Sequence, residues 1–305
     1  MRLFFLLGII ALLSGCELWF DNVNKQGDVE LYLSTVPRAE VSDTFLTITK
    51  AELQHNAGQW HELTLEKDLS QRNLQRLDIT KPLHIASAKN IPKGRYTTLR
   101  LTFPVPAGRS IRRDTGGTFN TTISSTVAIP ITPEFSVTKG ETSSLLLPLD
   151  FQKNLAFYED EYDIHYEVEA SQLSAIAMDA GRIRGRISES ALNNLNCEST
   201  TLTTNNEREG AYVYLYKDSG QSLDTLADIM LGAQESPLAT AAIKATDEGN
   251  TYEYHFAPQP QGDYVLALTC DGLKDHPLYK NTTVKLSEGI RVKVPTRGET
   301  TVNIN

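Results

Sequence analysis

The sequence predicts an all-β protein of two antiparallel β-sandwich domains, with one short helix inserted in the second domain. Short runs of alternating apolar and polar residues recur along the 305-residue chain, separated by Gly, Pro and polar turns, as is typical of sandwiches. The phrase Pro-x-Gly-x-Tyr, followed by such a run, occurs twice, at 92–96 and 260–264. Because domains usually contain about 100 to 200 residues, a chain of this length suits two of them.

The first residues predict an export signal and a lipid anchor. Met1 and Arg2 precede LFFLLGIIALL, an apolar run too short to span a bilayer but suited to a signal peptide. The run ends in Leu-Ser-Gly-Cys, which resembles the bacterial lipobox, in which the cysteine is acylated and becomes the mature N-terminus. The resemblance implies a signal peptide over 1–15, a lipid on Cys16 and a tether over 16–27. The alternative is an ordinary signal peptide followed by a chance cysteine.

The anchor implies where the protein sits and which partners it meets. Two or three acyl chains hold a protein stably to a membrane, since each buried CH₂ contributes about 0.8 kcal/mol. Lipoproteins retained in the inner membrane of enteric bacteria typically carry Asp after the cysteine, whereas this chain has Glu17, which implies the outer membrane. The formal net charge of −9 disfavours nucleic acid as a partner.

Cys197 and Cys270 are the two remaining cysteines, and an exported protein meets an oxidising compartment. We therefore expect a disulfide between them. The alternative is a reactive thiol, for which neither LNCES nor LTCDG supplies a local base.

The first domain is expected over 28–172 and the second over 180–305, with the boundary near 171–179. In the first domain, Asn-Ala-Gly at 56–58 predicts a hairpin turn, and a helical turn is expected before the strand-like Leu-Asp-Ile at 77–79. Further strands are expected at 29–34, 45–53, 96–105, 125–131, 143–151 and 162–170.

In the second domain, strands are expected within 181–188, 210–220, 241–258, 262–270 and 290–305. The inserted helix is expected over 222–233. Ser222 suits its N-cap, Leu223, Leu226 and Met230 share one face, and Gly232 suits its end.

The doubled phrase predicts one structural corner in each domain. Its Gly can take positive φ in a tight turn, and its Tyr can be buried with the hydroxyl bonded to backbone, as in the tyrosine corner of immunoglobulin-type folds. The repeat therefore indicates two sandwiches rather than two active sites.

The second half of the chain, 181–305, is similar to prealbumin-like, carboxypeptidase-regulatory-like and Cna-B-type domains. The similarity is carried by GRIRGRI, AYVYLYKDSG, PQGDYVLAL and VKVPTRGETTVNIN, and it implies a Greek-key sandwich. Cna-B domains often carry a first-strand Lys for an internal isopeptide bond. This strand offers only Arg182, Arg184 and Arg186, which argues against that bond.

The first half, about 27–170, resembles the bacterial lipoprotein family known as domain of unknown function 4382. The stretches that carry the resemblance are VELYLSTVPRAEVSDTFLTITKAELQHNAGQWHEL, RLDIT followed by LHIASAKNIPKGRYTTLRLTF, and LLLPLDF. The family has no established activity, so the resemblance implies no ligand.

Two groups of carboxylates and histidines are candidate metal ligands. The run at 158–163 could bind calcium through Glu159, Asp160, Glu161 and Asp163, but it lacks the spacing and Gly of a DxDxDG loop, and the alternative is a solvated loop. His55 and His61 flank the hairpin turn without a third ligand, which favours a solvated hairpin over a metal site. No metal and no cofactor are expected.

Arginines and aromatic residues are the candidate binding groups. Arg182, Arg184 and Arg186 project from one face of a strand and could bind acidic polysaccharide, or could form a charged edge that prevents aggregation. Trp60 and the tyrosines of AYVYLY could form a sugar platform, although one sequence does not show which side they take.

Catalytic signatures are absent from the sequence: it contains no HExxH, GxSxG, Walker loop or CxxC. We therefore expect a non-enzymatic, membrane-anchored lipoprotein of the bacterial cell envelope that serves as a binding or scaffold module. Its partner besides the membrane would be a polysaccharide or an envelope protein. The alternatives are a carbohydrate-binding surface protein and, third, an enzyme of unknown type.

Overall fold

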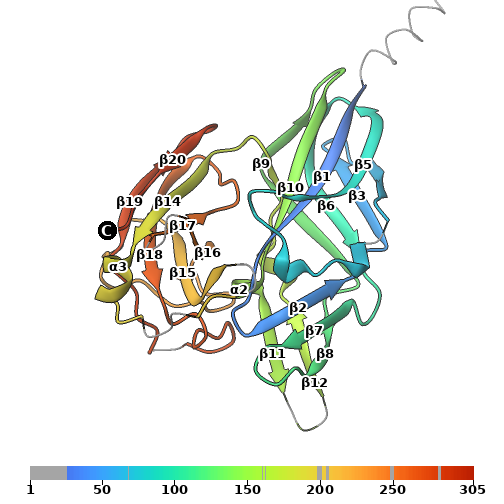
Figure 1. Ribbon diagram of the computed structural model, residues 1–305. Helices are drawn as coiled ribbons and strands as arrows, with labels where there is room; N and C mark the ends of the chain where they lie inside the picture. The colour runs from blue at the N-terminus through green and yellow to red at the C-terminus, as the bar shows by residue number, and fades with distance from the viewer. Residues whose placement is uncertain are drawn as a thin grey trace, which may run out of the picture.

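The computed structural model describes residues 26–67, 69–159, 161, 163–197, 201–203, 206–247, 251–280 and 283–305. Their regular structure is almost entirely β, which confirms the predicted fold class. Two β domains lie side by side, the first in blue to green and the second in yellow to red (Figure 1). Among the described residues, no helix is long and apolar enough to cross a membrane.

The larger sheet of the first domain has eight strands in the order β13, β10, β1, β5, β4, β3, β6, β9. The backbone of Ala175, just before β13, bonds to Pro130 and Thr132 in β9, so the two outer edges meet and the sheet curls into a barrel-like form. The strands are β1 (Gln26–Val36), β3 (Lys50–His55), β4 (Trp60–Leu65), β5 (Leu83–Pro92), β6 (Gly94–Thr102), β9 (Thr126–Val137), β10 (Thr142–Asp150) and β13 (Ile176–Ala177).

A second sheet of the first domain lies at the bottom of Figure 1. Its order is β11 (Leu155–Glu159), β12 (Ile164–Val168), β8 (Thr118–Thr122), β7 (Gly108–Arg112) and β2 (Val41–Leu46). Inward side chains from both sheets, among them Leu31, Leu33, Leu46 and Tyr166, form one hydrophobic core.

The second domain has one sheet in the order β19, β18, β15, β16, β17, β14, β20. Val213, Leu215, Ile243 and Leu266 are buried in its hydrophobic core. Its strands are β14 (Arg182–Ser188), β15 (Glu207–Lys217), β16 (Ala239–Ala245), β17 (Thr251–His255), β18 (Gly262–Thr269), β19 (Ile290–Val294) and β20 (Glu299–Thr301).

The helix expected over 222–233 is not formed. That segment is irregular, and tertiary partners take up its backbone groups: the Tyr216 hydroxyl donates to the Ala227 carbonyl at 2.6 Å, and the Ile229 N–H donates to Asp275 Oδ2 at 3.1 Å. The short helix of this domain is instead α3 (Glu189–Asn194), whose first turn is capped by the Ser188 hydroxyl.

Smaller differences from the expected strands have local causes. The segment 45–53 is divided between β2 and β3, and 77–79 forms no strand but follows two single-turn 3₁₀ helices, η2 (Leu69–Gln71) and η3 (Leu74–Arg76). Strands β7 and β8 were not expected. Their inward positions Ser110 and Thr121 carry hydroxyls that bond to each other at 2.8 Å, so the apolar alternation is missing.

The doubled phrase forms the corners that it predicts. The Tyr96 hydroxyl donates to the Pro92 carbonyl at 2.9 Å, and the Tyr264 hydroxyl donates to the Pro260 carbonyl at 2.7 Å. Both rings are buried, and Gly94 takes a φ of +140° between Pro92 and Tyr96. Gly262 does not take the positive φ that was expected in the second corner.

Candidate functional site at the domain junction

Three tyrosines of β15 fill the junction between the domains. Tyr212, Tyr214 and Tyr216 project from one face of the strand and pack with Val36 and Ala39 of the first domain. The Tyr212 hydroxyl donates across the junction to the Pro37 carbonyl at 2.9 Å. These are the tyrosines of AYVYLY, and their exposed fractions of 0 to 3% remove them as a sugar platform.

Tyr214 leads to a buried acid. Its hydroxyl donates to Asp275 Oδ2 at 2.7 Å, and the same oxygen accepts the Ile229 N–H. Burial raises the pKa of Asp275 to about 6. Because Asp275 joins β15 to the irregular 222–233 segment, it organises the wall of the junction.

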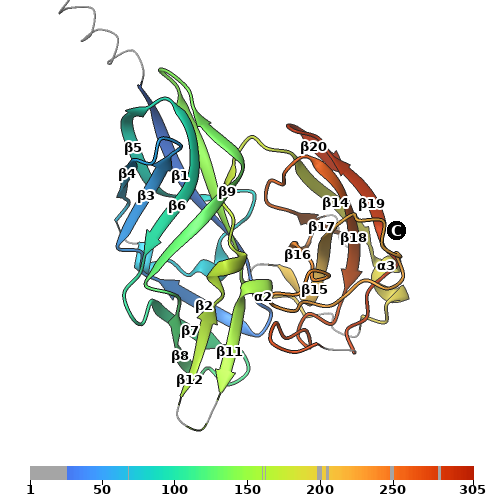
Figure 2. The same ribbon diagram turned by 180° about the vertical axis from the view of Figure 1, so that it is seen from behind.

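A second set of polar contacts comes from the four-residue helix α2 (Phe151–Asn154), which lies between the domains (Figures 1 and 2). The Lys153 ammonium donates to the Leu238 carbonyl at 3.0 Å, and the Gln152 amide donates to the Gly272 carbonyl at 2.8 Å. Both side chains are buried. Burial lowers the pKa of Lys153, and burial also raises the pKa of Asp150, the N-cap of α2.

Charged residues of alternating sign cross four neighbouring strands beside the junction. The register places Glu207 of β15 opposite Lys244 of β16, Lys244 opposite Glu253 of β17, and Glu253 opposite Arg186 of β14. Opposite charges on directly paired positions stabilise a sheet. We call these four residues the charge ladder.

The charge ladder borders a small cavity of about 40 Å³ between the domains. Asp78 of the first domain approaches the Lys244 ammonium at 3.7 Å, and burial raises the pKa of Glu207 to about 7. His255 also lines this cavity, 3.6 Å from Glu253. A histidine beside carboxylates is an arrangement capable of proton transfer, but the cavity is far below the several hundred Å³ of typical ligand pockets. The charge ladder was not expected from the sequence, because a single sequence does not specify which residues of neighbouring strands are paired.

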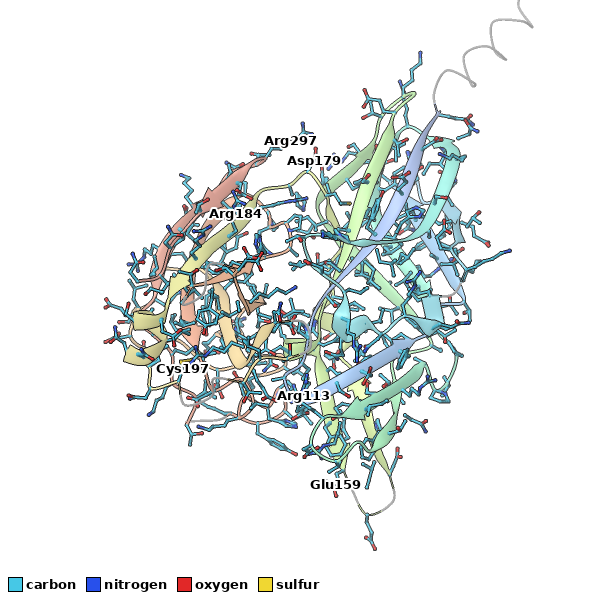
Figure 3. The ribbon with its side chains drawn as sticks, viewed as in Figure 1. Arg113, Glu159, Asp179, Arg184, Cys197 and Arg297 are labelled. Atoms are coloured by element: carbon cyan, nitrogen blue, oxygen red, sulfur yellow. A yellow bond between two sulfur atoms is a disulfide. The ribbon has the colours of Figure 1, made fainter. Side chains whose placement is uncertain are left out.

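The three arginines of β14 lie on its solvent face. β14 is an interior strand between β17 and β20, so the arginines do not form the charged edge considered as an alternative. Arg184 pairs with Glu299 at 2.6 Å, and Arg182 donates to the Met178 carbonyl at 3.0 Å. Arg184 and Arg186 line a cavity of about 380 Å³. Figure 3 shows Arg184 on the second domain, below the pair formed by Asp179 and Arg297.

Trp60 is remote from these arginines, on β4 of the first domain. The Arg100 guanidinium lies 3.8 Å from the centroid of the Trp60 ring and covers one face of it. In the part of the chain that the structure describes, Tyr279 is the only large aromatic residue that is well exposed. The structure therefore brings no aromatic strip together.

Glu159, Glu161 and Asp163, three of the four expected calcium residues, lie at the tip of the β11–β12 hairpin, where Figure 3 labels Glu159. Asp160 lies outside the described residues. Asp163 approaches His165 at 2.9 Å, and Glu161 is exposed. Within the described ranges, no group of three or more His, Cys, Asp or Glu side chains could hold a metal ion.

His55 and His61 are half-buried, and their rings cluster with Tyr96 beside the exposed hairpin turn at 56–59. Their ring centroids are 6.5 Å apart, and the rings pack against Tyr96 at 5.1 and 5.8 Å. Both Nε2 atoms are buried without a hydrogen-bond partner among the described residues. Burial lowers the pKa of His61.

Cys197 and Cys270 form a disulfide, with their Cα atoms 5.4 Å apart. It ties the segment after α3 to the end of β18; Figure 3 labels Cys197. Cys16, the expected lipidation site, lies outside the described residues.

Comparisons with known proteins identify one family. A family model described as domain of unknown function (DUF4382) matches residues 26–181. No curated protein matches the sequence.

Three of the similar solved structures are of bacterial proteins. A protein proposed to be an adhesin of Bacteroides ovatus is 11% identical, with 92% of this chain and 89% of that chain covered and a TM-score of 0.20. The minor pilin of Streptococcus agalactiae is 11% identical, with 90% and 94% covered and a TM-score of 0.18. A protein proposed to act in cell adhesion in Parabacteroides distasonis is 8% identical, with 88% and 84% covered and a TM-score of 0.19.

Proposed function

The chain belongs to the DUF4382 family through residues 26–181, and we propose that it is a non-enzymatic lipoprotein of the bacterial cell envelope. In this proposal its two domains form one rigid binding or scaffold module, held at the outer membrane by a lipid on Cys16.

The observation that carries this proposal is the buried domain junction. Domains of one chain move relative to each other unless their interface is large and hydrophobic. Here Val36 and Ala39 share a core with Tyr212 and Tyr214, and hydrogen bonds from α2 close the same interface. Such a junction fixes the second domain at a constant orientation, which suits a module that presents a surface to a partner.

The non-enzymatic part rests on how the buried titratable groups are used. Asp275 is bonded to Tyr214, Glu207 faces Lys244 in the charge ladder, and Asp150 caps α2 while accepting hydrogen bonds from Thr240. Each of these acids supports a contact within or between the domains. Of the three, only Asp150 lines a cavity of ligand size, and there both of its carboxylate oxygens accept hydrogen bonds from Thr240 and from the Lys153 backbone.

The anchor is tested by fractionation of cells that express the whole chain. The native chain should label with palmitate and sediment with outer membranes, whereas Cys16→Ser should do neither. A native chain released without label would overturn the lipid anchor.

The rigid junction is tested separately by unfolding the Cys16→Ser chain in urea. With Trp19→Phe added, Trp60 is the only tryptophan and reports on the first domain, while far-UV circular dichroism reports on both. One coincident transition is expected for a single unit. A first-domain transition well separated from the dichroism change would contradict the rigid module.

A further inference from the structure

A larger cavity lies at the junction beside α2. It has a volume of about 420 Å³, within the range of about 300 to 1,000 Å³ of pockets that hold ligands. Its walls come from both domains and are mainly apolar, with Pro130, Pro148, Pro258, Pro260, Leu173 and Leu238. Leu238 stands at the rim with 48% of its surface exposed.

Asn154 lines this cavity and has an unfilled hydrogen-bonding group. The residue is 4% exposed, and its Oδ1 has no partner in the part of the chain that the structure describes. Its backbone is fixed because the Asn154 carbonyl accepts the Glu169 N–H at 2.8 Å. The terminal amide torsion is soft, so rotation can turn Oδ1 toward the cavity. A buried amide oxygen without a partner is an acceptor awaiting a donor.

Lys153 supplies the complementary group. Its side chain also lines the cavity, and its ammonium has three donors, of which one is used by the Leu238 carbonyl at 3.0 Å. The Asp150 carboxylate, the nearest acid on α2, accepts its hydrogen bonds from the Lys153 backbone and from Thr240. Among the described residues, an ammonium donor of Lys153 therefore remains for a ligand.

The Asn154 amide, the Lys153 ammonium and the apolar walls determine which class of ligand fits the cavity. The ligand must donate one hydrogen bond and accept another, and it must have an apolar body. A carboxylate is disfavoured because Asp150 already places a negative charge beside Lys153. A sugar lacks an aromatic face to stack on, since Tyr264 is only 2% exposed with its hydroxyl bonded to Pro260. A hydrocarbon chain has no donor for Asn154. An extended main chain offers N–H and C=O groups with apolar side chains alternating beside them.

We propose that this cavity binds an extended, apolar segment of a partner polypeptide. A main-chain N–H of the partner donates to Asn154 Oδ1, a main-chain carbonyl accepts from Lys153 Nζ, and apolar side chains pack on the prolines and Leu238. This inference rests on the proposed binding module and names the class of its partner.

The test uses the full chain carrying Cys16→Ser and a displayed library of random heptapeptides. The enriched sequences, made as capped peptides, are titrated calorimetrically into three proteins: the parent, Leu238→Glu and Leu273→Glu. Leu273 is a matched control because it is 46% exposed and lies outside the cavity. We expect apolar sequences to be enriched, binding to fall at least tenfold with Leu238→Glu, and binding to be unchanged with Leu273→Glu.

A second variant separates binding from folding. Asn154→Leu replaces the unpartnered amide with an apolar side chain of similar size, so we expect an equal or higher Tm together with at least tenfold weaker peptide binding. No enriched peptide on a folded sample, equal binding by Leu238→Glu, or unchanged binding by Asn154→Leu would each overturn the proposal. So would saturable binding of a glycan array that is lost in Leu238→Glu. None of these results alters the fractionation or the urea transition, so failure here is distinct from failure of the anchored module.

Discussion

Thr240 of the second domain makes two hydrogen bonds to the carboxylate of Asp150 in the first domain. Its N–H donates to Oδ2 at 2.6 Å, and its hydroxyl donates to Oδ1 at 2.8 Å. Both residues are buried, so the contact is shielded from water. Asp150 thus caps α2 and joins the domains with the same side chain.

Thr240→Val tests this contact, because it removes the hydroxyl and keeps the shape and the backbone N–H. We expect a loss of about 2 kcal/mol in the free energy of unfolding, as for a buried hydrogen bond to a charged group. Urea denaturation gives the value. Thr97→Val, at an exposed position on β6, is the control and should change stability by less than about 0.5 kcal/mol. Equal effects of the two variants would show that Asp150 does not depend on the hydroxyl.

Glu207 should make stability depend on pH. Burial raises its pKa in the folded protein to about 7, above the ordinary glutamate value of 4.5. A raised carboxyl pKa contributes stability that is fully present below the unfolded pKa and is lost as pH rises through the folded pKa. Glu207→Gln removes this loss, so we expect the variant to gain stability relative to the parent between pH 5 and 8. Urea midpoints at four pH values measure it, and a constant difference would argue against the assignment.

His61 should make the protein less stable as the pH falls, the opposite of the effect of Glu207. Burial holds its pKa below 6.5, so the unfolded chain binds the proton more readily than the folded protein does. Stability should therefore fall as pH drops below about 6.5. His61→Phe keeps the ring contact with Tyr96 and should flatten this part of the profile of Tm against pH. A variant that keeps the parent's slope between pH 5 and 7 would place the effect elsewhere.

The hydrogen bonds of the two tyrosine corners should contribute similar amounts to the free energy of unfolding. Tyr96→Phe and Tyr264→Phe each remove one hydroxyl bonded to a proline carbonyl, at a cost of about 1 kcal/mol. Tyr214→Phe should cost more, because it leaves the buried Asp275 with one partner fewer. Thermal unfolding of the three variants gives the order, and an equal loss at Tyr214 would mean that Asp275 needs no hydroxyl.

Removal of the disulfide should destabilise the second domain. The bridge spans 73 residues of sequence, and closing a loop of that size contributes about 4 kcal/mol in the chain-entropy account. The double variant Cys197→Ser with Cys270→Ser should unfold at lower urea concentration. Reduction of the parent should reproduce the shift, and a midpoint unaffected by either treatment would show that the bridge is not stabilising.

The sequence predicted those features that depend on local chemistry. The Pro-x-Gly-x-Tyr corners need only a turn, a Gly and a large ring, and both formed. The burial of both faces of β15 could not be predicted from the sequence. Alternating side chains point to opposite faces of the sheet, and the face that carries the tyrosines is buried only because the first domain covers it. The spacing of Leu223 and Leu226 likewise predicted a helix with one buried face. Their side chains do face a core, but tertiary hydrogen bonds hold the backbone in another shape.

The candidate groups at the junction were the hardest to foresee. Lys153 and Asn154 follow a strand-like apolar run and resemble an ordinary polar turn in the sequence. Their burial comes from residues distant in the sequence, such as Pro258 and Leu238, the latter 85 positions from Lys153. Local patterns carry no information about contacts at that separation.

Strand β1 has a mechanical consequence. Its first two residues, Gln26 and Gly27, are the last two of the expected tether (16–27), and its last residue, Val36, enters the junction core. Between them β1 is flanked by β10 on one side and β5 on the other (Figure 1). A pull between the lipid and a partner held by the second domain would load these two ladders along the strand. Their hydrogen bonds would then share the force in shear instead of opening one by one, and the path from membrane to partner would bear tension.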